Sequence, residues 1–119
     1  MKSIVLKSEE RVTDLLTNEL RPEFLYHNLR HTQRVVSATE EILETVELSK
    51  EQNEQLRVAA WFHDVGYIKG TEGHEENSCL VVQDFLKEEG KTQDYIREVC
   101  QLIRATKRGY EPENLSEEI

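Results

Sequence analysis

The chain has 119 residues and a formal net charge of −9, from 15 basic and 24 acidic side chains. This length suits one domain, and the acidic balance argues against a nucleic-acid polymer or a membrane as partner, because both need a basic face. The sequence shows neither an apolar run near the roughly 20 residues of a membrane span nor a secretory signal. Since two cysteines without a CxxC spacing form no disulfide framework, we expect a cytoplasmic protein.

Apolar residues recur at helical spacing along the chain, without the alternation typical of strands. A first helix is predicted from Ser8, as its cap, to about Leu20, and Pro22 then breaks the pattern. A second helix is predicted over about 25–48. Its expected inward-facing stripe is His31, Val35, Ala38, Ile42 and Val46.

The second half of the chain predicts three more helices. Ser49 and Gln52 form a capping box for a third helix, which ends near Gly66. A fourth is expected over about 74–89, where Gly90 stops it, and Thr92 caps a fifth. The inward residues expected on these three helices are Leu56, Ala59, Ala60, His63, Val82, Phe85, Leu86, Ile96, Val99, Leu102 or Ile103, and Thr106.

Gly109 and Pro112 end the fifth helix, and residues 116–119 resemble the first turn of a sixth. We therefore expect an all-α class: a compact bundle of five to six helices. We expect this bundle to form a single domain over residues 1–119 that is truncated before the last, ligand-bearing helix.

Two of the four histidines, His31 and His63, lie on inward stripes of different predicted helices. An imidazole in a core costs desolvation unless it has a partner, which is either a hydrogen-bonding neighbour or a metal ion held between helices. Asp64 is adjacent to His63, so both side chains can converge on one ion. His27 precedes His31 by one turn on the same face, at the distance of a proton donor to a bound substrate.

Two motifs in this order, His31-x-x-Arg-Val and His63-Asp64-Val-Gly-Tyr67, resemble the HD domain of metal-dependent phosphohydrolases over residues 26–119. Segment 26–32 is also similar to the signature of cyclic-nucleotide phosphodiesterases, which belong to the same superfamily. Residues 62–64 together with 73–78 resemble a small bacterial branch of HD hydrolases. Tyr67 departs from other branches, which carry a lysine there.

The resemblance implies residue roles. His31, His63 and Asp64 match the metal ligands of the family, and His27 matches the group that protonates the leaving oxygen in the phosphodiesterases. His74 matches a histidine that lies beside the metal or serves a second ion. The last family ligand, an aspartate on a later helix, has no counterpart among the four aspartates of this chain.

These residues predict hydrolysis of a small-molecule phosphate ester, plausibly a nucleotide, with a divalent Mn, Fe, Ni, Zn or Mg ion. Asp64 would also orient the attacking water, and Lys69 and Lys107 are candidate phosphate contacts from their charge and position. Two alternatives stay open: a non-catalytic HD module with a structural or regulatory site, and a helical scaffold with hydrogen-bonded core histidines. The sequence also leaves open a homo-oligomer.

Overall fold

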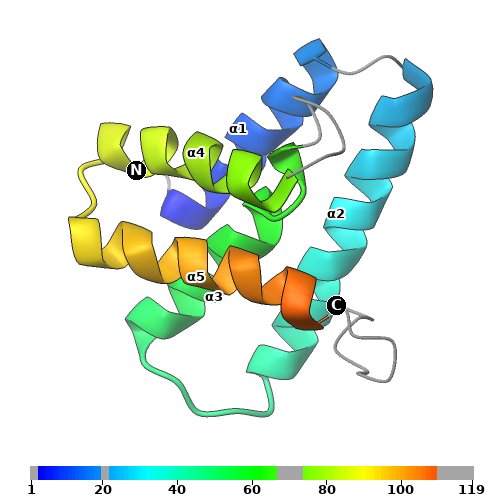
Figure 1. Ribbon diagram of the computed structural model, residues 1–119. Coiled ribbons are helices and arrows are strands. Elements are labelled where there is room, and N and C mark those ends of the chain that lie inside the picture. The colour runs from blue at the N-terminus through cyan, green and yellow to red at the C-terminus, as the bar shows by residue number, and fades with distance from the viewer. Residues whose placement is uncertain (1–2, 20–21, 67–73, 110–119) are drawn as a thin grey trace.

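The computed structural model describes residues 3–19, 22–66 and 74–109, which form five α-helices and contain no strand. The expected all-α class is therefore confirmed. The helices are α1 (Ile4–Glu19), α2 (Pro22–Leu43), α3 (Lys50–Phe62), α4 (His74–Glu88) and α5 (Gln93–Gly109). Helix α3 contacts all four others, while α1 pairs with α2 and α4 pairs with α5 (Figure 1). Among these helices, none is long and apolar enough to cross a membrane.

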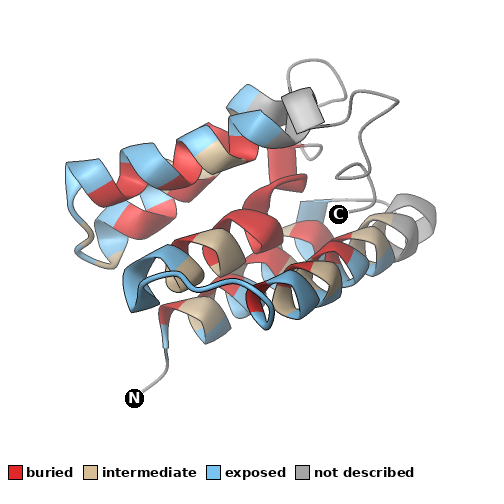
Figure 2. Ribbon diagram, turned by 90° about the horizontal axis from the view of Figure 1, so that it is seen from below, coloured by how far each residue is buried: buried red, intermediate tan, exposed pale blue. Residues whose placement is uncertain are grey.

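One core lies around α3 and draws its buried residues from α1, α3, α4 and α5, while partly buried side chains of α2 pack against it (Figure 2). The rings of Phe62 and Phe85 meet at its centre with their centroids 5.1 Å apart. The two cysteines are free thiols within this core. Its largest fully buried apolar side chains are Phe62, Phe85, Leu16, Leu86 and Ile103.

Helix α1 begins one turn earlier than predicted. Ser3, and not Ser8, accepts a hydrogen bond from a first-turn amide, that of Leu6, at 3.1 Å. Ser8 is fully buried inside the helix, where its hydroxyl donates to the carbonyl of Ile4 at 2.8 Å. A serine can satisfy its hydroxyl in either way, so the sequence favoured the wrong cap.

Helix α2 begins at Pro22, whose fixed φ and missing N–H suit a first helical turn. The predicted stripe is wrong at its end, because the helix stops at Leu43 and leaves Ile42 and Val46 more than 40% exposed. Thr39 is buried instead, since its hydroxyl donates to the carbonyl of Val35 at 2.9 Å. The buried residues of this stripe are Thr32, Val35, Thr39 and Leu43.

The predicted caps Ser49, Gly90 and Thr92 of the later helices are confirmed, but Gly66 does not cap α3, which stops at Phe62 with His63 as its C-cap. Ser49 and Gln52 form a complete capping box at α3. Gly90 ends α4 with φ +82°, the left-handed conformation typical of a glycine at this position, and Thr92 accepts from the amide of Tyr95 at 3.1 Å. Pro112 and the expected sixth helix lie outside the described residues, as does the side chain of Thr106.

Candidate metal centre

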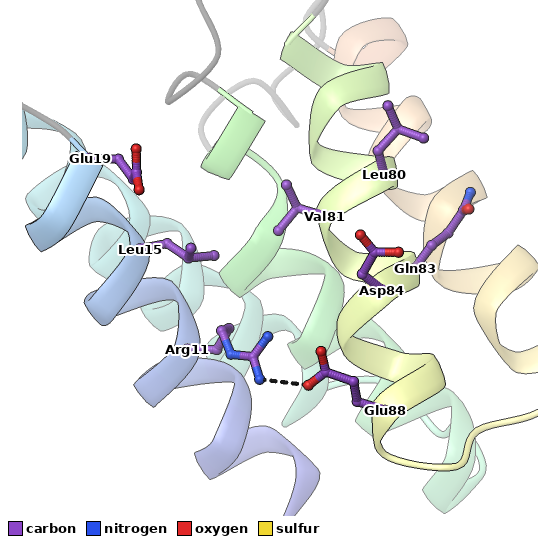
Figure 3. Close-up of a pocket in the computed structure, with 8 residues that line it drawn as sticks. All are labelled: Arg11, Leu15, Glu19, Leu80, Val81, Gln83, Asp84 and Glu88. Carbon is purple, nitrogen blue, oxygen red and sulfur yellow. Dashed lines mark hydrogen bonds and ion pairs between the residues drawn. The ribbon is translucent and has the colours of Figure 1, made fainter.

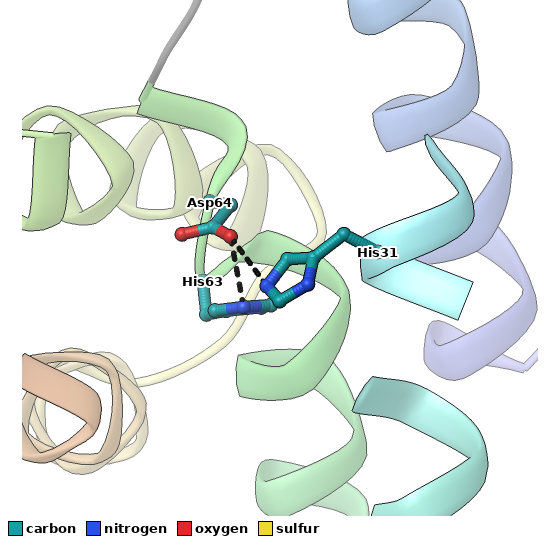
Figure 4. A group of neighbouring side chains, drawn as sticks. All are labelled: His31, His63 and Asp64. Atoms are coloured by element: carbon teal, nitrogen blue, oxygen red, sulfur yellow. Dashed lines mark ion pairs between the residues drawn. The ribbon is translucent and has the colours of Figure 1, made fainter. Parts of the chain in front are cut away.

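His31, His63 and Asp64 meet where α2 passes the end of α3 (Figure 4). The Nε2 atoms of His31 and His63 each lie 3.1 Å from Oδ2 of Asp64. The two rings are 5.5 Å apart between centroids and tilted by 51°. One possible ligand atom from each residue lies within 4.8 Å of the other two, which is the convergence that the sequence led us to expect.

The end of α3 positions two of these residues, His63 and Asp64. The helix stops at Phe62, and His63 follows as its C-cap with φ −60° and ψ −29°. Phe62 and Val65 are buried on either side, so the intervening turn is anchored in the core. His31 comes from α2, which an ion pair of 2.6 Å between Glu40 and Arg57 ties to α3.

The ring of His63 is oriented by its own helix. Its Nδ1 lies 2.8 Å from the carbonyl oxygen of Ala60, so Nδ1–H donates and Nε2 carries the lone pair in the neutral ring. Nε2 is buried and makes no hydrogen bond to any described residue, although Oδ2 of Asp64 is close. A lone pair facing a carboxylate oxygen is unfavourable unless a proton or a cation lies between them, so the arrangement fits a metal ion.

Asp64 is an ionised carboxylate at this site. Its burial alone would raise the pKa, but the imidazoles of His31 and His63, each with Nε2 3.1 Å from Oδ2, outweigh burial and hold the pKa of Asp64 well below its usual range. Two imidazole nitrogens and one carboxylate oxygen form a donor set suited to Mn, Fe, Ni or Zn.

The site is accessible from one side. The side chains of His63 and Asp64 are only 1% and 10% exposed, whereas that of His31 is 41% exposed. Catalytic metal sites typically use three protein ligands and leave a position for water or substrate. Among the described residues, three converging ligand groups with one accessible edge would leave such a position open.

The other predicted site residues are only partly placed. His27 lies in α2 one turn before His31, His74 is the first residue of α4, and Lys107 lies near the end of α5. The side chains of these three are outside the described part of the chain, as is the whole of Lys69. The structure therefore tests none of their expected contacts.

Sequence reasoning missed Ser78, a residue of α4. Its hydroxyl donates to the carbonyl of His63 at 3.0 Å and accepts from the amide of Gly66 at 2.8 Å, and the residue is fully buried. The available signal was a serine next to Cys79 and one turn before Val82 on the apolar face of a helix. A buried hydroxyl at such a position requires a partner.

A separate groove lies between α1 and α4 (Figure 3). The guanidinium of Arg11 pairs across it with Glu88 at 2.9 Å and stacks over the ring of Phe85. None of its lining residues belongs to the His31, His63 and Asp64 cluster. The groove is therefore distinct from the candidate metal centre.

Comparison with protein families assigns the chain to a class. A family model described as HD domain matches residues 28–119. The match spans most of the chain and includes all three converging residues, so the chain belongs to the HD-domain family. Comparison with curated proteins and with solved structures finds no match.

Proposed function

We propose that this protein is a metal-dependent phosphohydrolase that acts on a phosphate ester of a small molecule, such as a nucleotide. The main support is the buried Nε2 of His63, which makes no hydrogen bond to a described residue and lies, like Nε2 of His31, 3.1 Å from an ionised carboxylate oxygen of Asp64. Membership of the HD-domain family agrees with this chemistry.

His31, His63 and Asp64 would hold the ion. A bound divalent cation supplies Lewis-acid stabilisation of the phosphoryl group and lowers the pKa of water. Asp64, held ionised, would orient the attacking water by accepting its hydrogen bond. The half-exposed His31 marks the side from which substrate enters, and His27, one turn earlier on α2, would donate a proton to the leaving oxygen.

The charge of the protein gives the cation a second role. A net charge of −9 repels an anionic substrate, so local positive charge is needed where the phosphate binds. The cation would supply it, with Lys69 and Lys107 as the proposed further contacts. His74 is the proposed ligand or neighbour of a second ion.

The test is phosphate release by Mn²⁺-loaded protein from p-nitrophenyl phosphate and from a panel of nucleotides. Asp64→Asn should lose metal and lower the rate by more than about 100-fold, beyond the usual effect of losing an outer-shell partner. The matched control is Asp94→Asn, because Asp94 is an exposed aspartate paired only with Arg97 of its own helix among the described residues. It should keep the full rate.

A His27→Ala arm separates binding from chemistry. This variant should keep the Mn²⁺ affinity and lose turnover, and a full rate would reject the acid role of His27. Tight Mn²⁺ binding by the wild type without turnover of any substrate would instead favour a non-catalytic module with a regulatory or structural metal. Absence of metal binding would favour the other alternative, a helical scaffold with hydrogen-bonded core histidines.

A further inference from the structure

We propose that Ser78 is a positioning residue that sets the angle between the two adjacent ligands His63 and Asp64. The inference deepens the proposed function, on which the metal readout depends. It is carried by one hydroxyl on α4 that bridges two backbone groups of the ligand-bearing turn, the carbonyl of His63 and the amide of Gly66.

The carbonyl that Ser78 holds belongs to the peptide linking His63 to Asp64. Fixing the direction of that carbonyl fixes the plane of the peptide, and with it the relative directions in which the two side chains leave the backbone. The bond from Gly66 to the same hydroxyl holds the far end of the turn. Ser78 therefore acts on both residues that flank this peptide without touching their side chains.

The ring of His63 has a separate constraint. Its Nδ1–H donates to Ala60, within α3, and that bond sets the rotation of the imidazole. It does not set the direction of Asp64, which lies beyond the end of the helix. The hydroxyl from α4 holds the peptide that leads to Asp64.

Water cannot replace this hydroxyl easily, because Ser78 is 0% exposed and Gly66 is also buried. In Ser78→Ala, the carbonyl of His63 and the amide of Gly66 lose their shared partner. Because an unpaired buried backbone group is costly, we expect these two groups to rotate toward new partners. Rotation of the 63–64 peptide would turn Asp64 Oδ2 away from the two imidazole nitrogens.

If Ser78 only stabilised the fold, the result would be different, and the chain contains a matched control for this case. Ser8 is equally buried, and its hydroxyl donates to a backbone carbonyl within α1, that of Ile4. Ser8→Ala therefore removes the same atom from an equally buried position and does not disturb the ligand-bearing turn. Ser78→Thr keeps the hydroxyl and serves as the rescue variant.

The experiment measures Mn²⁺ affinity by isothermal titration together with the melting temperature of the metal-free proteins. We expect both alanine variants to melt a few degrees lower. Only Ser78→Ala should also weaken Mn²⁺ binding, by about 10- to 100-fold as for other outer-shell partners, and Ser78→Thr should restore it. Wild-type affinity in Ser78→Ala would overturn the proposal.

A metal-free measurement separates this inference from the proposed function. Hydrogen exchange followed by NMR should show a protected Gly66 amide in the wild type, and faster exchange with shifted His63 ring signals in Ser78→Ala. If the wild type binds no Mn²⁺ but these changes occur, the proposed function fails and the positioning role stands. An unprotected Gly66 amide in the wild type overturns the role even if Ser78→Ala does not fold.

Discussion

The three converging side chains differ most in how far they are buried, and this difference separates their contributions to stability from their contributions to binding. His63 is 1% exposed by its side chain and fills core volume beside Phe62, whereas the side chain of His31 is 41% exposed. Removing a buried ring leaves a cavity and an unpartnered carbonyl, while removing an exposed ring leaves neither.

We therefore predict that His63→Ala and His31→Ala both lose Mn²⁺ binding but differ in stability. His63→Ala should lower the free energy of unfolding of the metal-free protein by about 2–4 kcal/mol, as for other large-to-small core changes, and His31→Ala by less than about 1 kcal/mol. Urea denaturation in the presence of a chelator measures both. Equal destabilisation would contradict the burial of His63, and retained Mn²⁺ binding would contradict the shared site.

The lowered pKa of Asp64 predicts that the stability of the metal-free protein depends on pH. Its pKa is lower in the folded protein than the ordinary value near 4, so the ionised carboxylate stabilises the fold above about pH 4. That contribution is lost as the pH falls through the lower folded pKa. Between pH 4 and 6, the free energy of unfolding of the metal-free wild type should exceed that of Asp64→Asn by about 1–3 kcal/mol, the strength of hydrogen bonds to a charged group. This difference should narrow toward about pH 2.5. A gap that stays constant below pH 4 would contradict this assignment.

At the residue scale, the sequence predicted the converging groups because His31 and His63 are polar exceptions on apolar stripes and Asp64 is adjacent to one of them. It did not reveal Ser78, whose role depends on how α4 lies against the turn after α3. Such a contact joins residues 12 to 15 positions apart through backbone atoms. Backbone atoms carry no residue-specific signal, so only the structure shows this contact.

At the scale of single elements, α3 carries the site at its end and depends on its cap at its beginning. The hydroxyl of Ser49 accepts from the amide of Gln52 at 3.0 Å, and the side chain of Gln52 accepts from the amide of Ser49 at 3.0 Å. This capping box is at the opposite end of the helix from His63. It therefore stabilises the helix without contacting the ligands.

We predict that Ser49→Ala lowers the free energy of unfolding by about 1 kcal/mol, the usual cost of losing an N-cap, with unchanged Mn²⁺ affinity. Thermal and urea denaturation measure the loss, and titration of the folded variant measures the affinity. Ser49→Asp is the matched control, because aspartate caps a helix equally well and should keep the wild-type stability. A weaker Mn²⁺ affinity in Ser49→Ala would show that the cap and the site are coupled along α3.

Caps of α3, α4 and α5 were predictable because each is a local pattern of a few residues. The buried stripe of α2 was not fully predictable, because the sequence favoured the apolar Ile42 as an inward residue, whereas the structure buries Thr39. Burial of Thr39 is tolerated because its hydroxyl donates to the carbonyl of Val35, while Ile42, one residue before the end of the helix, is exposed. Tertiary packing, and not the hydrophobicity of the local sequence, determines which face of α2 is buried.

For the whole molecule, the candidate site joins α2 to the end of α3, and α3 contacts every other helix. A cation held by His31 on one side and by His63 and Asp64 on the other would cross-link the bundle near its centre. A ligand that binds only the folded state stabilises that state by RT ln(1 + [L]/Kd), which is about 2.7 kcal/mol at 100 times Kd.

We predict that saturating Mn²⁺ raises the melting temperature of the wild type by roughly 10 °C, the shift that such a free energy gives in a domain of this size. Excess EDTA should reverse the increase. His31→Ala should show no shift with Mn²⁺, since it keeps the core of α3 but removes the link from α2, whereas Asp94→Asn should respond as the wild type does. Differential scanning calorimetry with and without metal measures all four cases. A wild-type melting temperature that neither Mn²⁺ nor EDTA changes would mean that no cation links α2 to α3.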